Sequence, residues 1–486
     1  MAARADRRAR RGPWPGPRSG AALCVAFALA ACSHTPPAVL PQFPLPETYK
    51  EAAPWVAAQP ADARPRDPWW RLYGDSELDG LQQRLVEHSP DLAAALARYR
   101  QSQAALDQVR ANRLPSVSGS LNVQRDRQSE MRPLRVLGPT SPNEYSSNTL
   151  GLDLEYEIDL WGRVRDLVSA GEALDQASQA DLASARLSLQ AQLADLYIAL
   201  RGLDRDALLL RDAEAAYGRA LDLVTRRHDG GVSSGLDLSR AQAQLDTTRS
   251  QTRQSQAQRA VLEHAIAALV GEPASGFSIE PRAVEIALPA VPVGLPSTLL
   301  ERRSDIAAAE RRVAAANASL GVAKAAYFPS VMLSALGGYQ SSDLGRFLRA
   351  PNLYWAIGPT LVLNLFDGGR RKAEEARVRA VLEESGARYR GVVVGAFQQV
   401  EDNLALLNHY GAAAESETAA VAASQRALDH ATARYREGAV SYLEVVTSQT
   451  ATLQAQRSAL DLSTRQRRAS VQLIRALGGG WEMPGP

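Results

Sequence analysis

Cysteine is almost absent from this sequence. Only Cys24 and Cys32 occur among 486 residues, and Cys24 lies in a segment that we expect to be removed from the mature chain. The mature chain therefore cannot form an internal disulfide bond, so its stability must come from packing and assembly. Methionine is also scarce, with four residues and no copper-like cluster. The net charge of +2 gives no support for nucleic-acid binding, which requires a clustered basic surface.

Long apolar runs are missing too. The run Ala21 to Ala31 has eleven residues and follows six arginines, and it is too short to cross a bilayer as a helix. This pattern predicts a secretory signal peptide over residues 1–31. Its end, Leu29-Ala30-Ala31-Cys32, resembles the lipobox of bacterial lipoproteins, which implies a lipid on Cys32, and Ser33 implies export to the outer membrane. Because one acyl chain is only part of a stable attachment, we expect a second membrane contact.

Proline is absent from residues 162–271, where the spacing of apolar residues is helical. Apolar and small residues from Val164 to Val224 recur in steps of about 3.5 residues, which is typical of a supercoiled helix. Such a helix would be roughly 90 Å long. A glycine-rich turn at residues 228–235 interrupts it, and a second helical segment follows up to Val270. The pattern predicts a long antiparallel helical hairpin over residues 162–271.

Alternating residues predict two strands before this hairpin, at 114–125 and 148–158. In the first strand Val117, Leu121 and Val123 alternate with uncharged polar residues, and in the second strand leucines alternate with Asp153 and Glu155. Strands of soluble sandwiches alternate in the same way. A length of about ten residues is, however, also that of a transmembrane β-strand, and the outer-membrane signal favours this interpretation.

The sequence then repeats itself. Pro90-Asp91-Leu92 matches Ser304-Asp305-Ile306, and Leu114-Pro115-Ser116 matches Phe328-Pro329-Ser330, both with the same offset and without a gap. Each repeat contains a helix, two strands and a hairpin, and the second copy is predicted to have strands at 328–339 and 354–365 and a hairpin at 369–477. The predicted organisation is a signal peptide (1–31), a Pro-rich segment (32–74), a first repeat (75–272), a Pro-rich linker (273–298), a second repeat (299–480) and a tail (481–486).

Four strands cannot span a membrane alone. In hydrocarbon every backbone polar group must be paired, so a spanning sheet must close, and about eight strands form the smallest barrel. Closure therefore requires several chains, and the long hairpins also need neighbours to cover their apolar faces. The expected fold class is a mixed α and β membrane protein, an internally duplicated strand pair plus long helical hairpin that assembles as a cyclic oligomer around a channel. The number of subunits does not follow from these patterns.

The chain resembles the TolC-like outer membrane factors, in particular the efflux lipoproteins of the NodT/OprM type. The resemblance extends from the lipobox, Leu29 to Cys32, to Trp481. It depends on the segments Asp67-Pro68-Trp69-Trp70-Arg71-Leu72-Tyr73-Gly74-Asp75, Glu301-Arg302-Arg303-Ser304-Asp305-Ile306-Ala307-Ala308-Ala309-Glu310, Leu365-Phe366-Asp367-Gly368-Gly369-Arg370 and Ala476-Leu477-Gly478-Gly479-Gly480-Trp481.

This resemblance implies a homotrimer with a twelve-stranded outer-membrane β-barrel and an α-helical periplasmic tunnel. It implies the outer membrane channel of a tripartite efflux system of the RND type, which passively conducts what an inner-membrane transporter and a periplasmic adaptor (membrane fusion) protein deliver. The cargo does not follow from the sequence.

The resemblance also assigns roles to the two hairpin turns. Asp237 and Glu444 match acidic residues around the periplasmic aperture, where carboxylates would filter ions by charge. Alternatively, both are ordinary helix N-terminal residues stabilised by the helix dipole. Val440 stands where some members have an arginine that ties neighbouring hairpins, and Ser304 stands where proline is usual. The residues expected to contact the adaptor are Gly231, Val232, Ser233, Ser234, Gly235, Leu236, Gly438, Ala439, Val440, Ser441 and Leu443.

Other classes of protein fit the sequence less well. An outer membrane duct of type I protein secretion would share the same architecture. A lipid-anchored coiled-coil scaffold or adhesin would explain the helices and the lipid without strands, and a periplasmic adaptor has one hairpin rather than a duplicated unit. We expect no enzyme and no cofactor beyond the lipid on Cys32, because the six histidines lack metal-ligand spacing and no nucleophile and base occur together.

Overall fold

The structure is a computed structural model that describes residues 50, 68–131, 142–291 and 302–479. The signal peptide, Cys32, most of the predicted Pro-rich segment and the tail lie outside these residues. The described chain forms two compact units. The strand unit contains residues 103–131, 142–175 and 312–386, and the hairpin unit contains the rest. Each unit combines segments of both sequence repeats.

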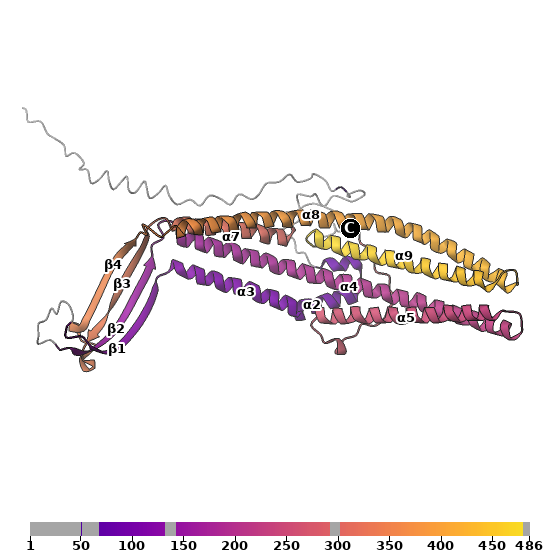
Figure 1. Cartoon of the computed structure of the whole chain (residues 1–486), viewed down its shortest axis with the longest axis horizontal. Helices are drawn as coiled ribbons and strands as arrows, with labels where there is room; N and C mark the ends of the chain where they lie inside the picture. The colour runs from indigo at the N-terminus through magenta and orange to yellow at the C-terminus, as the bar shows by residue number, and fades with distance from the viewer. Residues whose placement is uncertain (1–49, 51–67, 132–141, 292–301, 480–486) are drawn as a thin grey trace, which may run out of the picture. The chain divides into compact units, whose positions relative to one another are not determined.

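The strand unit contains one four-stranded antiparallel sheet (Figure 1). Its strands are β1 (Ser116–Arg127), β2 (Glu144–Glu157), β3 (Ser330–Ser341) and β4 (Leu353–Val362), and they are hydrogen-bonded in the order β1-β2-β3-β4. The central pair, β2 and β3, joins the first repeat to the second. β1 begins after Pro115, which lacks the N–H group that a ladder requires, and β2 begins four residues before the predicted start because Glu144 pairs with Arg127.

Aromatic residues fix the ends of the strands in this unit. The Trp161 ring stacks on the Phe328 ring with 4.8 Å between centroids, and Trp161 Nε1 donates a hydrogen bond to the Pro329 carbonyl at 2.7 Å. These residues connect the end of the β2 segment to the start of β3. On the helical side, a Cβ at Gly171 would lie 3.3 Å from Leu106, so glycine permits close packing of α3 (Pro90–Arg110) against the start of α4 (Arg163–Asp229).

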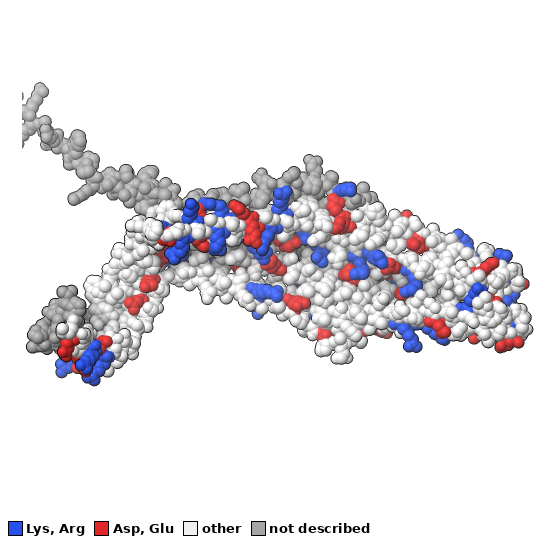
Figure 2. Space-filling view, in the orientation of Figure 1, with Lys and Arg blue, Asp and Glu red and all other residues white. Residues whose placement is uncertain are grey.

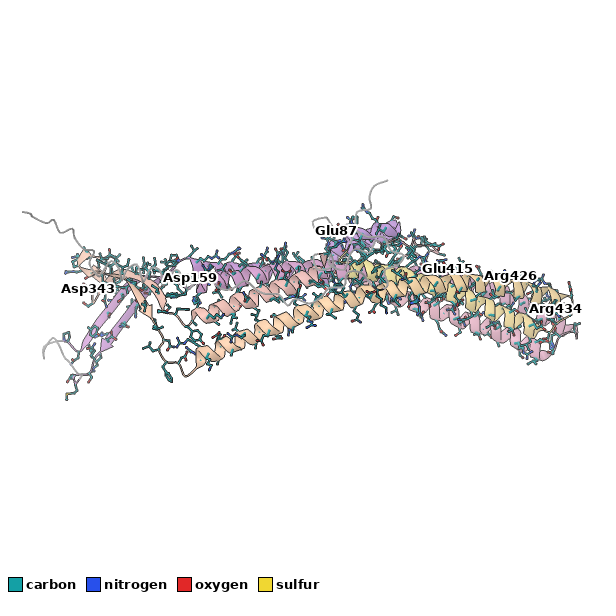
Figure 3. All side chains as sticks on the ribbon, turned by 90° about the horizontal axis from the view of Figure 1, so that it is seen from above. Glu87, Asp159, Asp343, Glu415, Arg426 and Arg434 are labelled. Atoms are coloured by element: carbon teal, nitrogen blue, oxygen red, sulfur yellow. The ribbon has the colours of Figure 1, made fainter. Side chains whose placement is uncertain are left out.

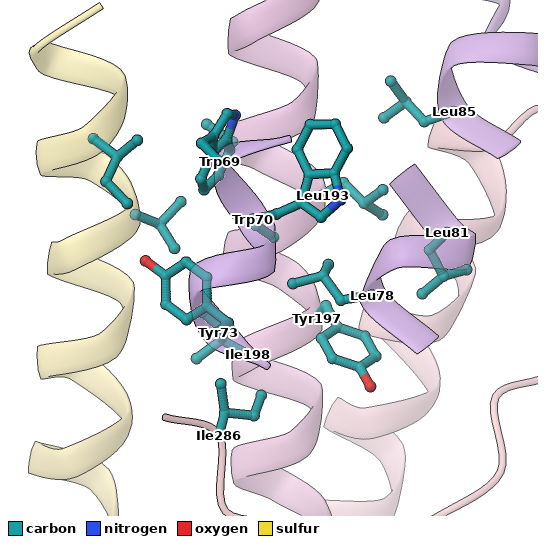
Figure 4. Packing of buried hydrophobic residues seen from close by; sticks show 14 of the residues in the cluster. Trp69, Trp70, Tyr73, Leu78, Leu81, Leu85, Leu193, Tyr197, Ile198 and Ile286 are labelled. Atoms are coloured by element: carbon teal, nitrogen blue, oxygen red, sulfur yellow. The ribbon is translucent and has the colours of Figure 1, made fainter. Parts of the chain in front are cut away.

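The hairpin unit contains the larger hydrophobic core. It comprises α2 (Ser76–His88), most of α4, α5 (Gly235–Leu269), the later part of α8 (Arg370–Arg436) and α9 (Tyr442–Ala476). The short helices η1 (Trp69–Tyr73) and η3 (Ala274–Gly276) also belong to this unit, and α3 and α7 (Ser304–Ala325) begin in it. Figure 4 shows Trp69, Tyr73 and Leu78 packed against Leu193 and Ile198 of α4.

The described parts of the Pro-rich segments contribute to this core. η1 lies at the end of the first Pro-rich segment, and Trp69 and Tyr73 are only 3% and 1% exposed. The linker between the repeats has no helix or strand from Phe277 to Val291, but Ile279 and Ile286 are buried. Proline spacing does not indicate what the intervening apolar residues contact.

The 3.5-residue pattern of α4 describes its packing only in part. Leu193, Leu200, Tyr217 and Val224 are buried as the pattern predicts, whereas Leu174 is 51% exposed. In the middle of the helix burial extends around most of the circumference, because η1, α2, α9 and the linker all contact this region. Among the described residues, no helix combines the length and the apolarity needed to cross a membrane.

Candidate functional site: the sheet face and the hairpin tips

The strand register collects the apolar residues of all four strands on one face of the sheet. Residues paired across an antiparallel ladder lie on the same face, so Gly119↔Leu152↔Gly337↔Trp355 forms one row across the sheet. Two further rows are Leu121↔Leu150↔Tyr339↔Leu353 and Val117↔Leu154↔Ala335↔Ile357. The apolar face therefore consists of Val117, Gly119, Leu121, Val123, Leu150, Leu152, Leu154, Tyr156, Val331, Leu333, Ala335, Gly337, Tyr339, Leu353, Trp355, Ile357, Pro359 and Leu361.

Much of this apolar face is uncovered in the single chain. Leu121 is 67% exposed, Leu152 62% and Trp355 72%. An exposed apolar surface of this continuity marks contact with a membrane or a partner rather than with water. None of the residues of the apolar face is charged. At one end of the sheet Arg125 and Arg127 pair with Glu144, and Figure 2 shows the charges of the visible strands gathered mainly at that end, with a few acidic residues further along.

The opposite face is polar and close-packed at its centre. It carries Ser118, Ser120, Asn122 and Asp153, among others. Gly338 is required where β3 pairs with β2, because a Cβ there would lie 1.9 Å from the Leu150 carbonyl oxygen. The two edge strands, β1 and β4, each have a paired neighbour on one side only within the described part of the chain. The sheet thus has one apolar face, one polar face and two open edges.

The two hairpin tips share one turn geometry. At the first tip Gly231 has a φ of +75°, and the Val232 N–H donates to the Arg227 carbonyl at 2.7 Å. At the second tip Gly438 has a φ of +80°, and the Ala439 N–H donates to the Arg434 carbonyl at 2.9 Å. Arg434 lies near this end of α8 (Figure 3). Positive φ accounts for glycine at both positions. The candidate adaptor-contacting side chains Val232, Leu236 and Leu443 are 77%, 58% and 45% exposed.

The two candidate aperture acids have different surroundings. Asp237 is part of an N-terminal cap of α5, because its N–H donates to Ser234 Oγ at 3.2 Å and its carboxylate accepts from the same hydroxyl at 3.0 Å. It also lies 3.8 Å from Arg240. Glu444 is exposed in the first turn of α9, and within the described residues it has no ion-pair partner. No contact joins the two acids in the described part of the chain, so the single protomer leaves both explanations of them open.

Arg227 ties the two tips together, and sequence analysis missed it. Its guanidinium donates to the carbonyls of Tyr435 and Arg436 at 3.0 Å each, and it lies 4.6 Å from the centroid of the Tyr435 ring. The carbonyls at a helix C-terminus have no intrahelical partner, so an arginine there satisfies them and favours the helix dipole. The neighbouring Tyr442 is buried, which raises its pKa to about 12. The local sequence does not show that Arg227 rather than Arg226 makes this contact, because the partners of Arg227 lie in the other sequence repeat.

A buried ion cluster in the hairpin unit was also missed. Arg201 is 1% exposed and donates to Asp204 at 2.6 Å and to the Glu280 carbonyl at 2.8 Å. It also pairs with Glu77 of α2, and Asp204 accepts from Arg259 of α5 at 2.6 Å. The cluster therefore connects α2, α4, α5 and the linker. Buried charges of this kind are tolerated only when each has its partners.

No candidate metal site was found in the parts of the chain that the structure describes. No three or more His, Cys, Asp or Glu side chains form a group that could hold an ion there. What the described residues offer is a membrane-type sheet surface and a pair of exposed turns at the ends of long helices.

Solved structures with the same architecture are outer membrane channels. The chain is similar to the outer membrane protein VceC from Vibrio cholerae, with a TM-score of 0.79 and 30% identity over 85% of this chain and 99% of that one. The CmeC outer membrane channel of Campylobacter jejuni shares the fold, with a TM-score of 0.84, at 22% identity over 94% and 96% of the two chains. The fold and the sheet surface thus define a TolC-like outer membrane channel.

Sequence comparison gives the family. The model of the outer membrane efflux protein family matches residues 81–272 and 295–479. The pyoverdine export outer membrane protein OpmQ of Pseudomonas aeruginosa is 34% identical over 93% of this chain and 95% of its own length. The outer membrane protein OprJ of the same species is 30% identical over 95% of each chain. The chain belongs to the outer membrane efflux protein family.

Proposed function

We propose that this protein is the outer membrane channel of a tripartite efflux system of the RND type. It passively conducts substrates delivered by an inner-membrane pump and a periplasmic adaptor to the exterior, and it performs no enzymatic step. The observation that carries the proposal is the apolar face across all four strands. Much of it is exposed in the part of the single chain that the structure describes, and it has the character of a lipid-facing surface.

The open edges support assembly as a homotrimer. β1 and β4 run antiparallel to each other within the order β1-β2-β3-β4, so β4 of one copy can pair antiparallel with β1 of the next. Repetition of this contact closes the sheet and removes its edges, as hydrocarbon requires. Three copies give a twelve-stranded barrel, which exceeds the smallest closed size of about eight strands, and the long helical hairpins form the periplasmic tunnel.

The other expected partners are membrane lipid and the periplasmic adaptor protein. A lipid on Cys32 anchors the chain in the outer membrane beside the barrel, and no other cofactor is needed. The exposed turns around Gly231 and Gly438 are the surfaces for the adaptor protein. The names of similar proteins support efflux over protein secretion, because they include a pyoverdine export protein and a toluene efflux protein from Pseudomonas putida. Those substrates belong to the named proteins, and the cargo of this chain is open.

Reconstitution of the purified mature protein in planar bilayers tests the channel. We expect discrete ion conductance, and migration on a denaturing gel as an oligomer that dissociates only on heating. A monomer that stays in aqueous solution and opens no conductance would overturn the proposal, and it would leave a coiled-coil scaffold as the better explanation.

Charge removal at the tips tests the aperture. Asp237→Asn retains the oxygen that accepts from Ser234, so the cap of α5 persists while the charge is lost, and Glu444→Gln removes the second charge. We expect the double variant to lose cation preference in bilayer conductance, because fixed carboxylates attract cations in a narrow passage. Glu415→Gln, on the exposed surface of α8 (Figure 3), serves as the control. Unchanged selectivity in the double variant would remove both acids from the aperture.

A further inference from the structure

A small polar cavity lies at the N-terminus of α7 in the hairpin unit. Its volume is about 110 Å³. Polar and charged side chains from three helices and from the start of α7 provide most of its walls. The lining residues are Ser184, Leu187, Ser188, Arg303, Ser304, Asp305, Gln399, Arg475 and Gly478.

Three serine hydroxyls in this wall have no hydrogen-bond partner within the described chain. They belong to Ser184 and Ser188 of α4 and to Ser304, the first residue of α7. Ser304 is only 8% exposed. A buried hydroxyl without a partner loses its hydrogen bonds to water and costs free energy, so such groups are normally satisfied by protein, water or ligand. Ser184 and Ser188 are half-buried, so this cost applies to Ser304, and the other two hydroxyls lie on the same cavity. This arrangement favours an occupant that accepts hydrogen bonds.

The helix itself favours an anion in this position. α7 is 22 residues long, and the first N–H groups of such a helix have no intrahelical partner and carry the positive end of the helix dipole. The Ile306 N–H is already bonded to the Asp305 carboxylate at 2.9 Å. Ser304 contributes an N–H group as well as its hydroxyl, and both would be lost with proline at this position.

The charges around the cavity leave a positive excess. Asp305 is neutralised by Arg303, which donates to its two oxygens at 3.0 and 2.6 Å and also bonds the Ala476 carbonyl at 2.9 Å. Arg475 has no acidic partner in the part of the chain that is described, and there its guanidinium donates only to the Gln472 amide oxygen, at 3.3 Å. One acid and two arginines thus give the cavity a charge of +1.

We propose that this cavity binds a single oxyanion of the phosphate class, held by Ser304, Arg475 and the serines of α4. A volume of about 110 Å³ is several times the share of about 30 Å³ that one water molecule occupies in liquid. A tetrahedral oxyanion has several acceptor oxygens, so it can satisfy the three hydroxyls and the arginine together. The site connects α4 with α7 and the C-terminal end of α9, and it is independent of conduction.

Phosphate titration of the purified full-length assembly tests this site. Calorimetry or thermal unfolding is measured with low-millimolar inorganic phosphate, and in parallel with glycerol 3-phosphate, against chloride at equal ionic strength. We expect saturable binding of inorganic phosphate. Additional binding of the monoester would show that the site also admits a phosphate attached to an organic group.

Two variants distinguish specific phosphate binding in this cavity from a nonspecific effect of salt. Ser304→Pro removes both donors of residue 304, and proline is compatible with the first position of a helix, so the fold persists. Arg475→Gln removes the uncompensated charge. Each variant should weaken phosphate binding about tenfold or more, because a hydrogen bond to a charged group contributes at least this factor.

The matched controls are Ser416→Ala and Arg426→Gln, both exposed on α8, and they should bind like the wild type. Absence of saturable binding, or equal binding in Ser304→Pro and the wild type, would overturn the proposal and leave water as the occupant.

Discussion

Single residues in this protein act mainly through partners that are distant in the chain. Arg227 and Tyr435 belong to different sequence repeats, and Arg201 is held by Glu77 and Glu280 from two other segments as well as by its own helix. Periodicity in the sequence reports whether a residue is apolar, and it does not report which distant carbonyl or carboxylate a given arginine meets. For this reason the ion cluster and the tip contact were absent from the sequence predictions.

The contribution of Arg227 can be separated from that of its neighbour. Arg227→Ala removes two hydrogen bonds to the end of α8, so the amides of residues 436–442 should exchange with solvent roughly tenfold faster. Arg226→Ala is the matched control, because Arg226 bonds only the Asp222 carbonyl of its own helix among the described residues. Hydrogen exchange followed by mass spectrometry gives the measurement. Equal acceleration in both variants would contradict the assigned role.

Asp305 should make stability depend on pH in the acid range. Burial of this carboxyl is the largest single influence and opposes its ionisation, but the hydrogen bonds and charge of Arg303 together with backbone N–H groups outweigh burial and lower its pKa below the ordinary value of 3.8. A lowered folded-state pKa contributes stability above the unfolded pKa, and that contribution is lost as pH falls through the folded pKa. The difference in unfolding temperature between wild type and Asp305→Asn should therefore shrink from about pH 5 to about pH 2. A difference that stays constant over this range would refute the assignment.

At the scale of elements, much of the architecture could be predicted from residue patterns. Proline-free helical spacing indicates the two hairpins, alternation indicates which side chains of each strand share a face, and the ungapped internal match of helix and strand indicates the duplication. The register between β2 and β3 could not be predicted in this way, because it joins strands from different repeats across a long stretch of chain. Nor could the burial of η1, since a Trp-Trp pair after prolines carries no signal for its contacts.

Among the contacts between elements, loss of the ion cluster should lower the free energy of unfolding most. Arg201→Ala leaves Asp204 and Glu77 without their shared partner, and breaking a buried pair from one side typically costs about 3–5 kcal/mol. Arg205→Ala, four residues later, removes a partly exposed arginine that lies 4.0 Å from Glu285, and it should cost below about 1 kcal/mol. Denaturant unfolding of the assembled protein compares the two. A similar decrease in the free energy of unfolding in both variants would show that the cluster contributes no more than a surface ion pair.

At the scale of the whole molecule, the two faces of the sheet must meet different surroundings. Leu121→Arg places a charge in the middle of the apolar face, which costs about 2–4 kcal/mol near the midplane of a bilayer. Ser120→Arg places the same charge one residue away on the polar face and should be tolerated. Heat-modifiable migration and conductance should therefore be impaired by Leu121→Arg alone. Equal tolerance of both substitutions would mean that the apolar face does not contact lipid.

The pairing of β2 with β3 has a consequence for how copies recognise each other. Since β1 matches β3 and β2 matches β4 between the two sequence repeats, the junction inside the chain is a template for the junction between chains. Leu154↔Ala335 then corresponds to Leu361 of one copy beside Leu121 of the next. Cysteines at these two positions should form an intermolecular disulfide under oxidising conditions. Each polypeptide thus contains, in its own centre, the pattern of the seam along which identical subunits join.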